Sequence, residues 1–430
     1  MNKQLSIFDK SYIKNKEKIL LGESTISSRL EYCRKTTQNH EVILLDLFRA
    51  YYDARKNKCN TINQLQFEIA YEKNIIELYE EIISYNYKPK RSICFMINKP
   101  VKREIFAADF SDRVIHHLIY NYIMPIFDGT FINDSYSCRI GKGTHYGIGR
   151  INNFIRSCSQ NYKQDCYVLK LDISGYFMAM DKKILFKQIK TTLHKKKHKI
   201  NFDLQLILSL IKTTIFNDPT KNCIVKGTRK DWNNLPTNKS LFHSNKDCGL
   251  PIGNLTSQLF GNVYLNQFDH FVKRDLGIKY YGRYVDDFVL IHPNKEYLKS
   301  LIEPIRKYLQ QELNLVLHPN KIYLQHYSKG LQYLGAIIKP NRIYVSKRTK
   351  GNFYNAIEKQ NKIARNSKPI KQEQKDFQAV MNSYLGIMAH YKSHKLRKKM
   401  IFGNLSGWWW NYVYLTGGIK KFEMKMKTVK

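Results

Sequence analysis

The stretch Lys279–His292, KYYGRYVDDFVLIH, contains two runs rich in aromatic and β-branched residues on either side of the pair Asp286-Asp287. Such runs are typical of β-strands, so we predict a tight hairpin with the two aspartates at its tip. Adjacent carboxylates repel each other unless a cation lies beside them. Because side chains alternate in direction along a strand, we expect one carboxylate to point toward a site and the other aside.

A third aspartate ends another strand-like stretch. In CYVLKLDISGYF, residues 166–177, the side chains alternate in character up to Asp172, and a turn that contains glycine follows. Core packing is a poor explanation for an aspartate at the exit of a strand. Together with Asp286 and Asp287, it would supply hard oxygen ligands for two Mg²⁺ ions, an arrangement suited to phosphoryl transfer. The alternative is that all three are solvated turn residues, because aspartate is common in turns.

The composition points to a nucleic-acid partner. The 430 residues include 72 Lys+Arg, 35 Asp+Glu and 30 Tyr, and the net charge is +37. So large an excess repels itself in a compact chain unless a polyanion neutralises it, and a nucleic-acid groove combines basic with aromatic side chains. A general solubility surface or an AT-rich genome is the alternative, but genome bias explains lysine over arginine and not the shortage of acids.

Other classes of protein are excluded by simple counts. No apolar run approaches the roughly 20 residues of a membrane span, and the first residues lack the apolar core of a signal peptide. The eight cysteines are singly spaced, without a CxxC pair, so we expect neither a zinc ribbon nor a disulfide framework. We therefore predict a cytoplasmic protein with free thiols and no membrane contact.

Apolar periodicity predicts the remaining elements. The stretch RSICFMINKPVKREIFAAD, 91–109, indicates a hairpin. In Lys187–Lys199 no acid occurs, and either a solvated face or a phosphate-contacting strip would explain this run. Helices are expected around Ile43, Leu44, Leu47 and Tyr51, at 72–84, in IHHLIYNYIMPIF (115–127), after Asn254 through Leu255, Leu259 and Val263, and from about 341 onward.

These motifs resemble those of reverse transcriptases. The box Tyr284–Asp287 matches their YxDD motif, and Asp172 with Ile173–Phe177 matches their first catalytic motif. The resemblance is ordered along residues 72–400. Its other parts are Lys99–His117 and Ser135–His145 in the fingers, Cys248–Asn266 before the YxDD hairpin, and His318–Ile322 and Tyr333–Gly335 in the later palm.

One segment narrows the resemblance. The form Ile252–Gln258 is similar to diversity-generating retroelement enzymes and to bacterial "unknown group" reverse transcriptases, several of which serve antiphage defence. The sequence SGYFMAMD, 174–181, departs from the diversity-generating pattern. Both roles therefore stay open.

The resemblance implies an α+β fold, the right-hand polymerase with fingers, an antiparallel-sheet palm and an α-helical thumb. It divides the chain into a helical extension (1–70), fingers (71–165), a palm (166–340) with a basic insert at about 186–248, and a thumb with the C-terminal tail (341–430). The implied activity is RNA-directed DNA polymerase. Two rivals are a catalytically silent RNA-binding homologue, which the intact aspartates oppose, and an RNA-dependent RNA polymerase, which Phe177 opposes as a steric gate against a ribose 2′-hydroxyl.

The resemblance also implies roles for single residues. Asp172, Asp286, Asp287 and the carbonyl of Ile173 would hold Mg²⁺, with Mn²⁺ as a substitute, and Lys321 would protonate the leaving pyrophosphate. The dNTP would meet Lys99, Arg103, Arg139, Phe177 and Gln258, and the nucleic-acid strands would meet Gly253, Tyr284, Tyr333, Gly335, Lys395 and Arg397.

The implied partners are an RNA template, a cognate non-coding RNA, the DNA product, and an accessory protein or a second copy. For Trp408–Trp410 we favour packing within the thumb over stacking on bases.

Overall fold

The computed structural model describes residues 30–56, 61–98, 101–366 and 368–425. These residues form two compact units. The first holds the described part of Met1–Ile126 with Ile189–Asn234 and Pro251–Ser257, and the second holds Phe127–Gln188, Leu235–Leu250 and Gln258–Lys430 as far as they are described. No helix in the described ranges is long and apolar enough to cross a membrane.

Helices surround a small sheet in the first unit. Helices α2 (Leu30–Arg55), α3 (Ile62–Ile69), α4 (Tyr71–Ile83) and α5 (Phe110–Asp128) precede or follow the hairpin of β1 (Ile93–Ile97) and β2 (Arg103–Ala107). The predicted stripe is buried at Ile43, Leu47 and Tyr51, and the Tyr51 ring stacks on Tyr71 with centroids 5.2 Å apart. The predicted helices and hairpin of this region are thus confirmed.

Of the segment predicted as a basic insert, at about 186–248, residues Ile189–Asn234 lie with the first unit and the remainder lies with the second. Its strand β4 (Ile224–Val225) pairs in parallel with β1, so the sheet order is β2-β1-β4. Helix α9 (Leu204–Phe216) buries six apolar side chains, which explains why this part of the chain packs as core rather than as a polar insert. The other short elements of this part of the first unit are η1 (Lys197–Lys199), η2 (Pro219–Lys221) and η3 (Arg229–Trp232). Helix α8 (Lys182–Lys195) begins in the second unit and continues into the first, and η4 (Thr237–Lys239) and η5 (Leu241–His243) belong to the second unit.

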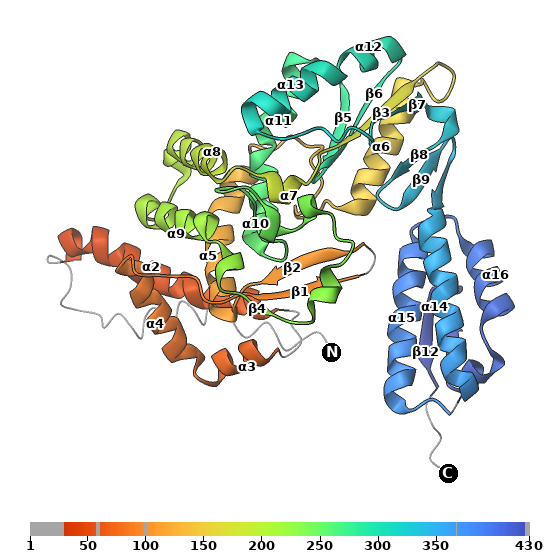
Figure 1. The fold of residues 1–430 in the computed structure, drawn as a ribbon, viewed down its shortest axis with the longest axis horizontal. Coiled ribbons are helices and arrows are strands. Elements are labelled where there is room, and N and C mark those ends of the chain that lie inside the picture. Colours follow the sequence, from red (N-terminus) through yellow and green to blue (C-terminus); the bar gives the residue numbers. More distant parts are fainter. Residues whose placement is uncertain (1–29, 57–60, 99–100, 367, 426–430) are drawn as a thin grey trace. The chain divides into compact units, whose positions relative to one another are not determined.

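A four-stranded antiparallel sheet forms the centre of the second unit (Figure 1). Its order is β5 (Tyr280–Tyr284), β6 (Asp287–His292), β3 (Tyr167–Asp172) and β7 (Tyr323–His326). Helix α6 (Thr144–Cys158) packs Ile148, Ile151 and Ile155 against Val168, Val289 and Ile291 on one face. The remaining elements around this sheet are α7 (Tyr176–Ala179), α10 (Leu255–Tyr264), α11 (Asn266–His270), the π-helical turn η6 (Phe271–Asp275), α12 (Lys295–Ser300) and α13 (Ile302–Leu313).

The C-terminal part of the second unit is a helical bundle that ends in a hairpin (Figure 1). Trp409 is fully buried there and stacks on Phe377 with ring centroids 4.0 Å apart, which confirms packing for this tryptophan, whereas Trp408 is exposed. The final hairpin was not predicted from the sequence. The elements are η7 (Tyr327–Lys329), the sheet of β8 (Leu331–Tyr333), β9 (Ala336–Lys339) and β10 (Arg342–Val345), the helices α14 (Lys347–Asn366), α15 (Lys371–Ala389) and α16 (His394–Asn404), η8 (Gly407–Asn411), and the hairpin of β11 (Val413–Thr416) and β12 (Lys421–Met424).

Candidate active site

The three predicted aspartates lie at one end of the central sheet. Asp172 is the last residue of β3 and stands opposite Asp287, the first residue of β6, in the antiparallel register. Asp286 lies in the turn between β5 and β6, where Val285 adopts a left-handed backbone with φ of 56°. The hairpin and the strand exit are therefore as the sequence predicts, and Asp172 becomes a neighbour of the pair Asp286-Asp287, from which it is far apart in sequence.

The backbone beside Asp172 is fixed by a short bridge to the segment before β7. The N–H of His318 donates to the Asp172 carbonyl at 2.9 Å, and the N–H of Ser174 donates to the Val316 carbonyl at 2.9 Å. This pairing does not use the carbonyl of Ile173, whose side chain is buried. The predicted ligand position of that carbonyl is thus compatible with the local hydrogen bonding.

The electrostatics of the site call for positive charge. Burial, followed by the charges of Asp172 and Asp287, raises the pKa of Asp286 to about 6. Burial also raises the pKa of Asp287 to about 6, even though Lys170 opposes the shift. The carboxylates are therefore costly to ionise together, which is the usual result of crowding like charges in a partly desolvated place.

Two lysines form ion pairs with these carboxylates and supply part of the positive charge. Lys321 Nζ lies 2.7 Å from Asp172 Oδ1, and Lys170 Nζ lies 3.0 Å from Asp287 Oδ2. Lys321, predicted to act on the leaving group, has a side chain that is 49% exposed and thus accessible to a nucleotide. Lys170 lies two residues before Asp172 on β3 and was not predicted, although its place inside an apolar strand is the signal that marks it.

The donor chemistry of the site fits a hard divalent cation. Carboxylate oxygens are the ligands that Mg²⁺ prefers, and the buried Oδ1 of Asp287 has no hydrogen-bond partner. Among the described residues, however, no three His, Cys, Asp or Glu side chains converge closely enough to hold a metal ion. The two-ion centre therefore stays a prediction.

A fully buried ion pair supports the hairpin that carries Asp286. Arg283 donates from Nε and Nη2 to the two carboxylate oxygens of Asp269 at 2.7 and 2.6 Å, and both side chains are inaccessible to solvent. The same guanidinium donates from Nη1 to the Val285 carbonyl at 2.9 Å, and the Val285 N–H donates to Ser137 Oγ at 3.2 Å. Both peptide groups of the strained turn residue are therefore held. Sequence reasoning missed this pair; its signal is an arginine between apolar and aromatic strand residues.

Phe177 follows Asp172 closely in the sequence and has a defined place in the fold. Its ring is half-buried on α7, and the Leu250 N–H donates to its carbonyl at 2.8 Å. A Cβ added at Gly261 would lie 3.4 Å from the Phe177 ring, so the helix α10 approaches the ring closely at a residue without a side chain. The ring position is thus fixed by neighbouring elements.

The structure does not support the predicted contact between Arg139 and the dNTP. Its side chain is only 5% exposed, and its guanidinium donates to Asp128 Oδ1 at 2.6 Å and to the carbonyls of Ile132 and Ser135. These bonds occupy its donors within the fold, so it is not available to a triphosphate. Its role is to hold the loop that follows α5.

Two predicted nucleic-acid contacts are also corrected. Tyr333 is fully buried in the core cluster beneath α6, and Lys170 lies 5.9 Å from the centre of its ring. Arg397 is 4% exposed and donates to the Ile419 carbonyl before β12. Tyr284 is half-buried against the same cluster as Tyr333. The first two side chains pack the fold and do not face a nucleic acid.

The other predicted contacts are accessible or outside the described residues. Lys395, Gln258 and Arg103 are exposed. Gly335 has φ of 84° and open space around the position of a Cβ, whereas a Cβ at Gly253 would lie 3.0 Å from the Phe106 carbonyl oxygen. Gly253 is therefore required by its backbone conformation and by a close approach. Lys99 lies outside the described residues.

Comparison with known proteins agrees with the geometry of the site. The family described as "Reverse transcriptase (RNA-dependent DNA polymerase)" matches residues 88–338, which is more than half of the chain. Protein YkfC from Escherichia coli (strain K12) is 23% identical over 305 residues, which cover 63% of this chain and 72% of that protein.

Solved structures of telomerase are also similar. Apo telomerase from Candida Tropicalis truncated from its C-terminal domain has a TM-score of 0.43 at 14% identity and covers 62% of this chain and 59% of that chain. Telomerase from Candida albicans in complex with a TWJ fragment of telomeric RNA has a TM-score of 0.42 at 10% identity and covers 78% of this chain and 61% of that chain. The chain thus spans about three fifths of the telomerase chains that it matches.

The ordered motifs, the antiparallel sheet with its three aspartates and the match over residues 88–338 lead to one family. The predicted family and fold class are confirmed, and the predicted enzyme, an RNA-directed DNA polymerase, is of the class that this family describes. The chain belongs to the reverse transcriptase (RNA-dependent DNA polymerase) family.

Proposed function

We propose that this protein copies RNA into DNA by adding dNTPs to the 3′ end of a primer. The observation that carries the proposal is the meeting of Asp172, Asp286 and Asp287 at one end of the sheet in a chain of this family. In the reaction, the 3′ oxygen forms a bond to the α-phosphorus, the bond from that phosphorus to its bridging oxygen breaks, and pyrophosphate leaves.

The carboxylates of Asp172 and Asp286 and the carbonyl of Ile173 would hold Mg²⁺, or Mn²⁺ in its place, with Asp287 assisting. Divalent ions bound there supply positive charge for the attacking and leaving oxygens. The raised pKa values of Asp286 and Asp287 and the unpartnered Oδ1 of Asp287 support this assignment, because they mark carboxylates that lack sufficient positive charge.

Lys321 is suited to the leaving group. Its ammonium lies 2.7 Å from Asp172 Oδ1 and its side chain is half exposed, so it is accessible to a nucleotide. We propose that it donates a proton to the departing pyrophosphate oxygen. Arg103 and Gln258 are exposed and remain our proposals for contacts to the dNTP.

Primer extension on an RNA template with either dNTPs or NTPs tests this function. We expect extension with dNTPs only, because the Phe177 ring would occupy the space of a 2′-hydroxyl. Phe177→Ala should keep dNTP extension and gain NTP extension, whereas Phe177→Tyr, which keeps the ring, should stay selective. Extension by the wild-type protein with NTPs alone would support an RNA polymerase, and extension with neither would support a silent RNA-binding homologue.

The biological role rests on the wider resemblance. We infer a cognate structured RNA, and antiphage defence or a diversity-generating retroelement as the setting. Sequencing the nucleic acid that co-purifies with the protein, before and after dNTPs are added, separates these roles. A repeat-derived cDNA with adenine-biased errors would support diversity generation, and a short repetitive or concatemeric product would support defence.

A further inference from the structure

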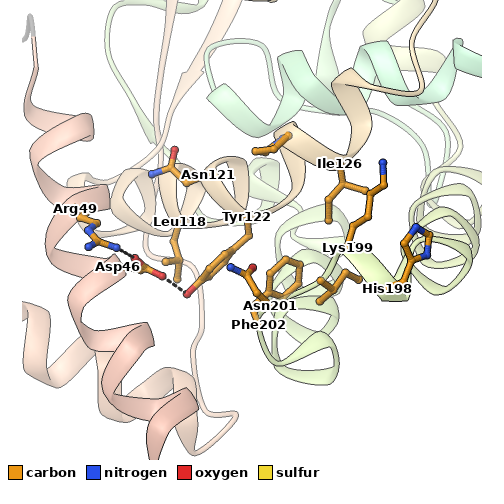
Figure 2. Close-up of a pocket in the computed structure, with 12 residues that line it drawn as sticks. Asp46, Arg49, Leu118, Asn121, Tyr122, Ile126, His198, Lys199, Asn201 and Phe202 are labelled. Carbon is orange, nitrogen blue, oxygen red and sulfur yellow. Dashed lines mark hydrogen bonds and ion pairs between the residues drawn. The ribbon is translucent and has the colours of Figure 1, made fainter.

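The first unit contains a pocket built from residues other than those of the aspartate site (Figure 2). Helix α2, helix α5 and the segment 198–202, which begins in η1 and ends before α9, line a volume of about 610 Å³. Pockets that bind small molecules or single nucleotides fall within this range of volumes. The pocket is therefore large enough for a ligand of that size.

One wall of the pocket is a fixed aromatic pair. The Tyr122 and Phe202 rings lie with centroids 4.7 Å apart at an angle of 37°. The Tyr122 hydroxyl donates to Asp46 Oδ2 at 2.8 Å, and Asp46 Oδ1 accepts from Arg49 at 2.6 Å, which Figure 2 shows as a continuous chain of contacts. Phe202 precedes Asp203, whose side chain accepts from the Leu206 N–H and thereby begins α9. The Tyr122 ring is therefore held by Asp46, which also lines the pocket, and Phe202 is held next to the start of α9.

Exposed polar side chains form another side of the same pocket. His198 and Lys199 line it, both are exposed, and within the described residues neither takes part in an ion pair. In the view of Figure 2 they lie across Tyr122 from Asp46 and Arg49. The charge of Arg49 is balanced by Asp46. Lys199 therefore offers positive charge to an anion at this pocket, and His198 beside it offers a ring nitrogen for a hydrogen bond.

The chain next to the pocket is rich in lysine and histidine. Between Lys190 and Lys199 there are five lysines and two histidines and no acid. The sequence left this run open between a solvated face and a strip that contacts phosphates. An aromatic pair at its end favours the second interpretation, because stacking on bases and attraction to phosphates together bind single-stranded nucleic acid.

We propose that this pocket binds one nucleotide of a single-stranded RNA segment, with its base beside Tyr122 and Phe202 and its phosphates at His198 and Lys199. The adjoining run of lysines fits a polymer with repeating phosphates better than a free mononucleotide. Single-stranded RNA is also the form whose bases are free to stack on aromatic side chains. The inference rests on the proposed function in one respect, that RNA is the partner of the chain.

The affinity of the full chain for a labelled single-stranded RNA, measured by fluorescence anisotropy, tests the proposal with a matched pair of variants. Lys199→Glu and Lys197→Glu make the same charge change two residues apart, but only Lys199 lines the pocket. We expect Lys199→Glu to weaken binding by about tenfold or more and Lys197→Glu by about twofold. Equal weakening by both would overturn the pocket and leave a solvated basic face.

The aromatic wall has its own test. Phe202→Leu should weaken binding by about fivefold or more, because stacking on one base contributes roughly 1–3 kcal/mol, and Phe202→Tyr should retain the affinity. Thermal unfolding checks that each variant is folded. If Phe202→Leu is folded and binds as tightly as the wild-type protein, the base is not held there. If excess ATP displaces the RNA from this pocket, the ligand is a free mononucleotide, and the proposal that the pocket binds an RNA strand is wrong.

The outcome is separable from that of the polymerase assignment. Extension of a short primer–template should be unchanged in Lys199→Glu and Phe202→Leu, whereas Asp286→Asn should lose extension and keep its affinity for the single-stranded RNA. If Asp286→Asn keeps extension, the aspartate site is wrong. If Lys199→Glu and Phe202→Leu keep the affinity for RNA, the pocket is wrong.

Discussion

Asp112 is a carboxyl group that the first unit buries almost completely, with only 2% of its surface exposed. Its Oδ1 accepts from the Tyr87 hydroxyl at 2.8 Å, and its Oδ2 accepts from the Lys90 N–H at 2.9 Å. Burial raises the pKa of Asp112 to about 7, and the Tyr87 hydrogen bond only partly opposes that shift. Ionising this group therefore weakens the folded state.

The stability of the protein should depend on pH through this residue. The pKa of an unfolded aspartate is about 3.9, so the folded state binds the proton more tightly. The free energy of unfolding should then fall as pH rises from about 4 to about 7, and the loss should be complete above the folded pKa. Asp112→Asn removes the titration, so its thermal midpoint should change less between pH 5 and pH 8 than that of the wild-type protein.

Asp275→Asn, a change at an exposed aspartate, is the control and should follow the wild-type curve. Parallel curves for the wild-type protein and Asp112→Asn would show that Asp112 does not titrate as described.

For single residues, a sequence motif predicted where a residue lies in the fold better than it predicted whether the side chain is exposed to a ligand. Asp172 and Asp286 were identifiable because a carboxylate at a strand end or turn stands out in an apolar pattern. Arg139, Tyr333 and Arg397 were not, because the sequence does not show that neighbouring carbonyls, a carboxylate and core side chains surround them. Burial is a property of the whole packed unit.

At the scale of elements, the β5–β6 hairpin depends on a charge pair beside its turn. Arg283 and Asp269 are fully buried and satisfy each other, and the same guanidinium holds the carbonyl of Val285 in the strained turn before Asp286. Breaking one partner of such a pair leaves an uncompensated buried charge, which costs about 3–5 kcal/mol. The position of Asp286 is thus linked to two side chains outside the motif.

A pair of variants separates stability from positioning in this hairpin. Asp269→Leu should lower the free energy of unfolding by about 3–5 kcal/mol. The double change Arg283→Met with Asp269→Leu should recover most of that stability, because it replaces both charges by apolar groups. We expect primer extension by the double variant to stay low, since nothing then holds the Val285 carbonyl. Full activity in the double variant would show that the pair serves stability alone.

Strands of regular length were predictable, and short ones were not. The hairpins at 93–107 and 280–292 carry aromatic or β-branched runs that bound a turn, so their pattern is visible in the sequence. Strand β4 is only two residues long and is defined by its pairing with β1, and the pair β11–β12 is stabilised by packing of Val413 and Phe422 on the C-terminal helices. Such elements depend on distant partners.

At the scale of the whole molecule, the net charge of +37 is the dominant property. A phosphate polymer bound by lysines and arginines releases counterions, so its affinity falls steeply with salt. A chain that contacts six to ten phosphates would lose roughly 10³–10⁵ in affinity between 50 and 200 mM salt.

We therefore expect the affinity for RNA to fall by at least about a hundredfold over this range. The measurement is a salt titration of RNA binding, with a matched DNA of the same sequence as a comparison. A nearly flat dependence on salt would mean that the basic surface is not the binding surface.

The central claim is that three aspartates from two parts of the chain form one catalytic site. The most direct test is the rate of single-nucleotide extension on an RNA template with Mg²⁺ by Asp172→Asn and Asp286→Asn, with the exposed change Asp275→Asn as control and thermal unfolding as a check on the fold. We expect both site variants to lose at least about a hundredfold in rate while the control matches the wild-type protein. Extension at the wild-type rate by a folded Asp286→Asn variant would contradict it.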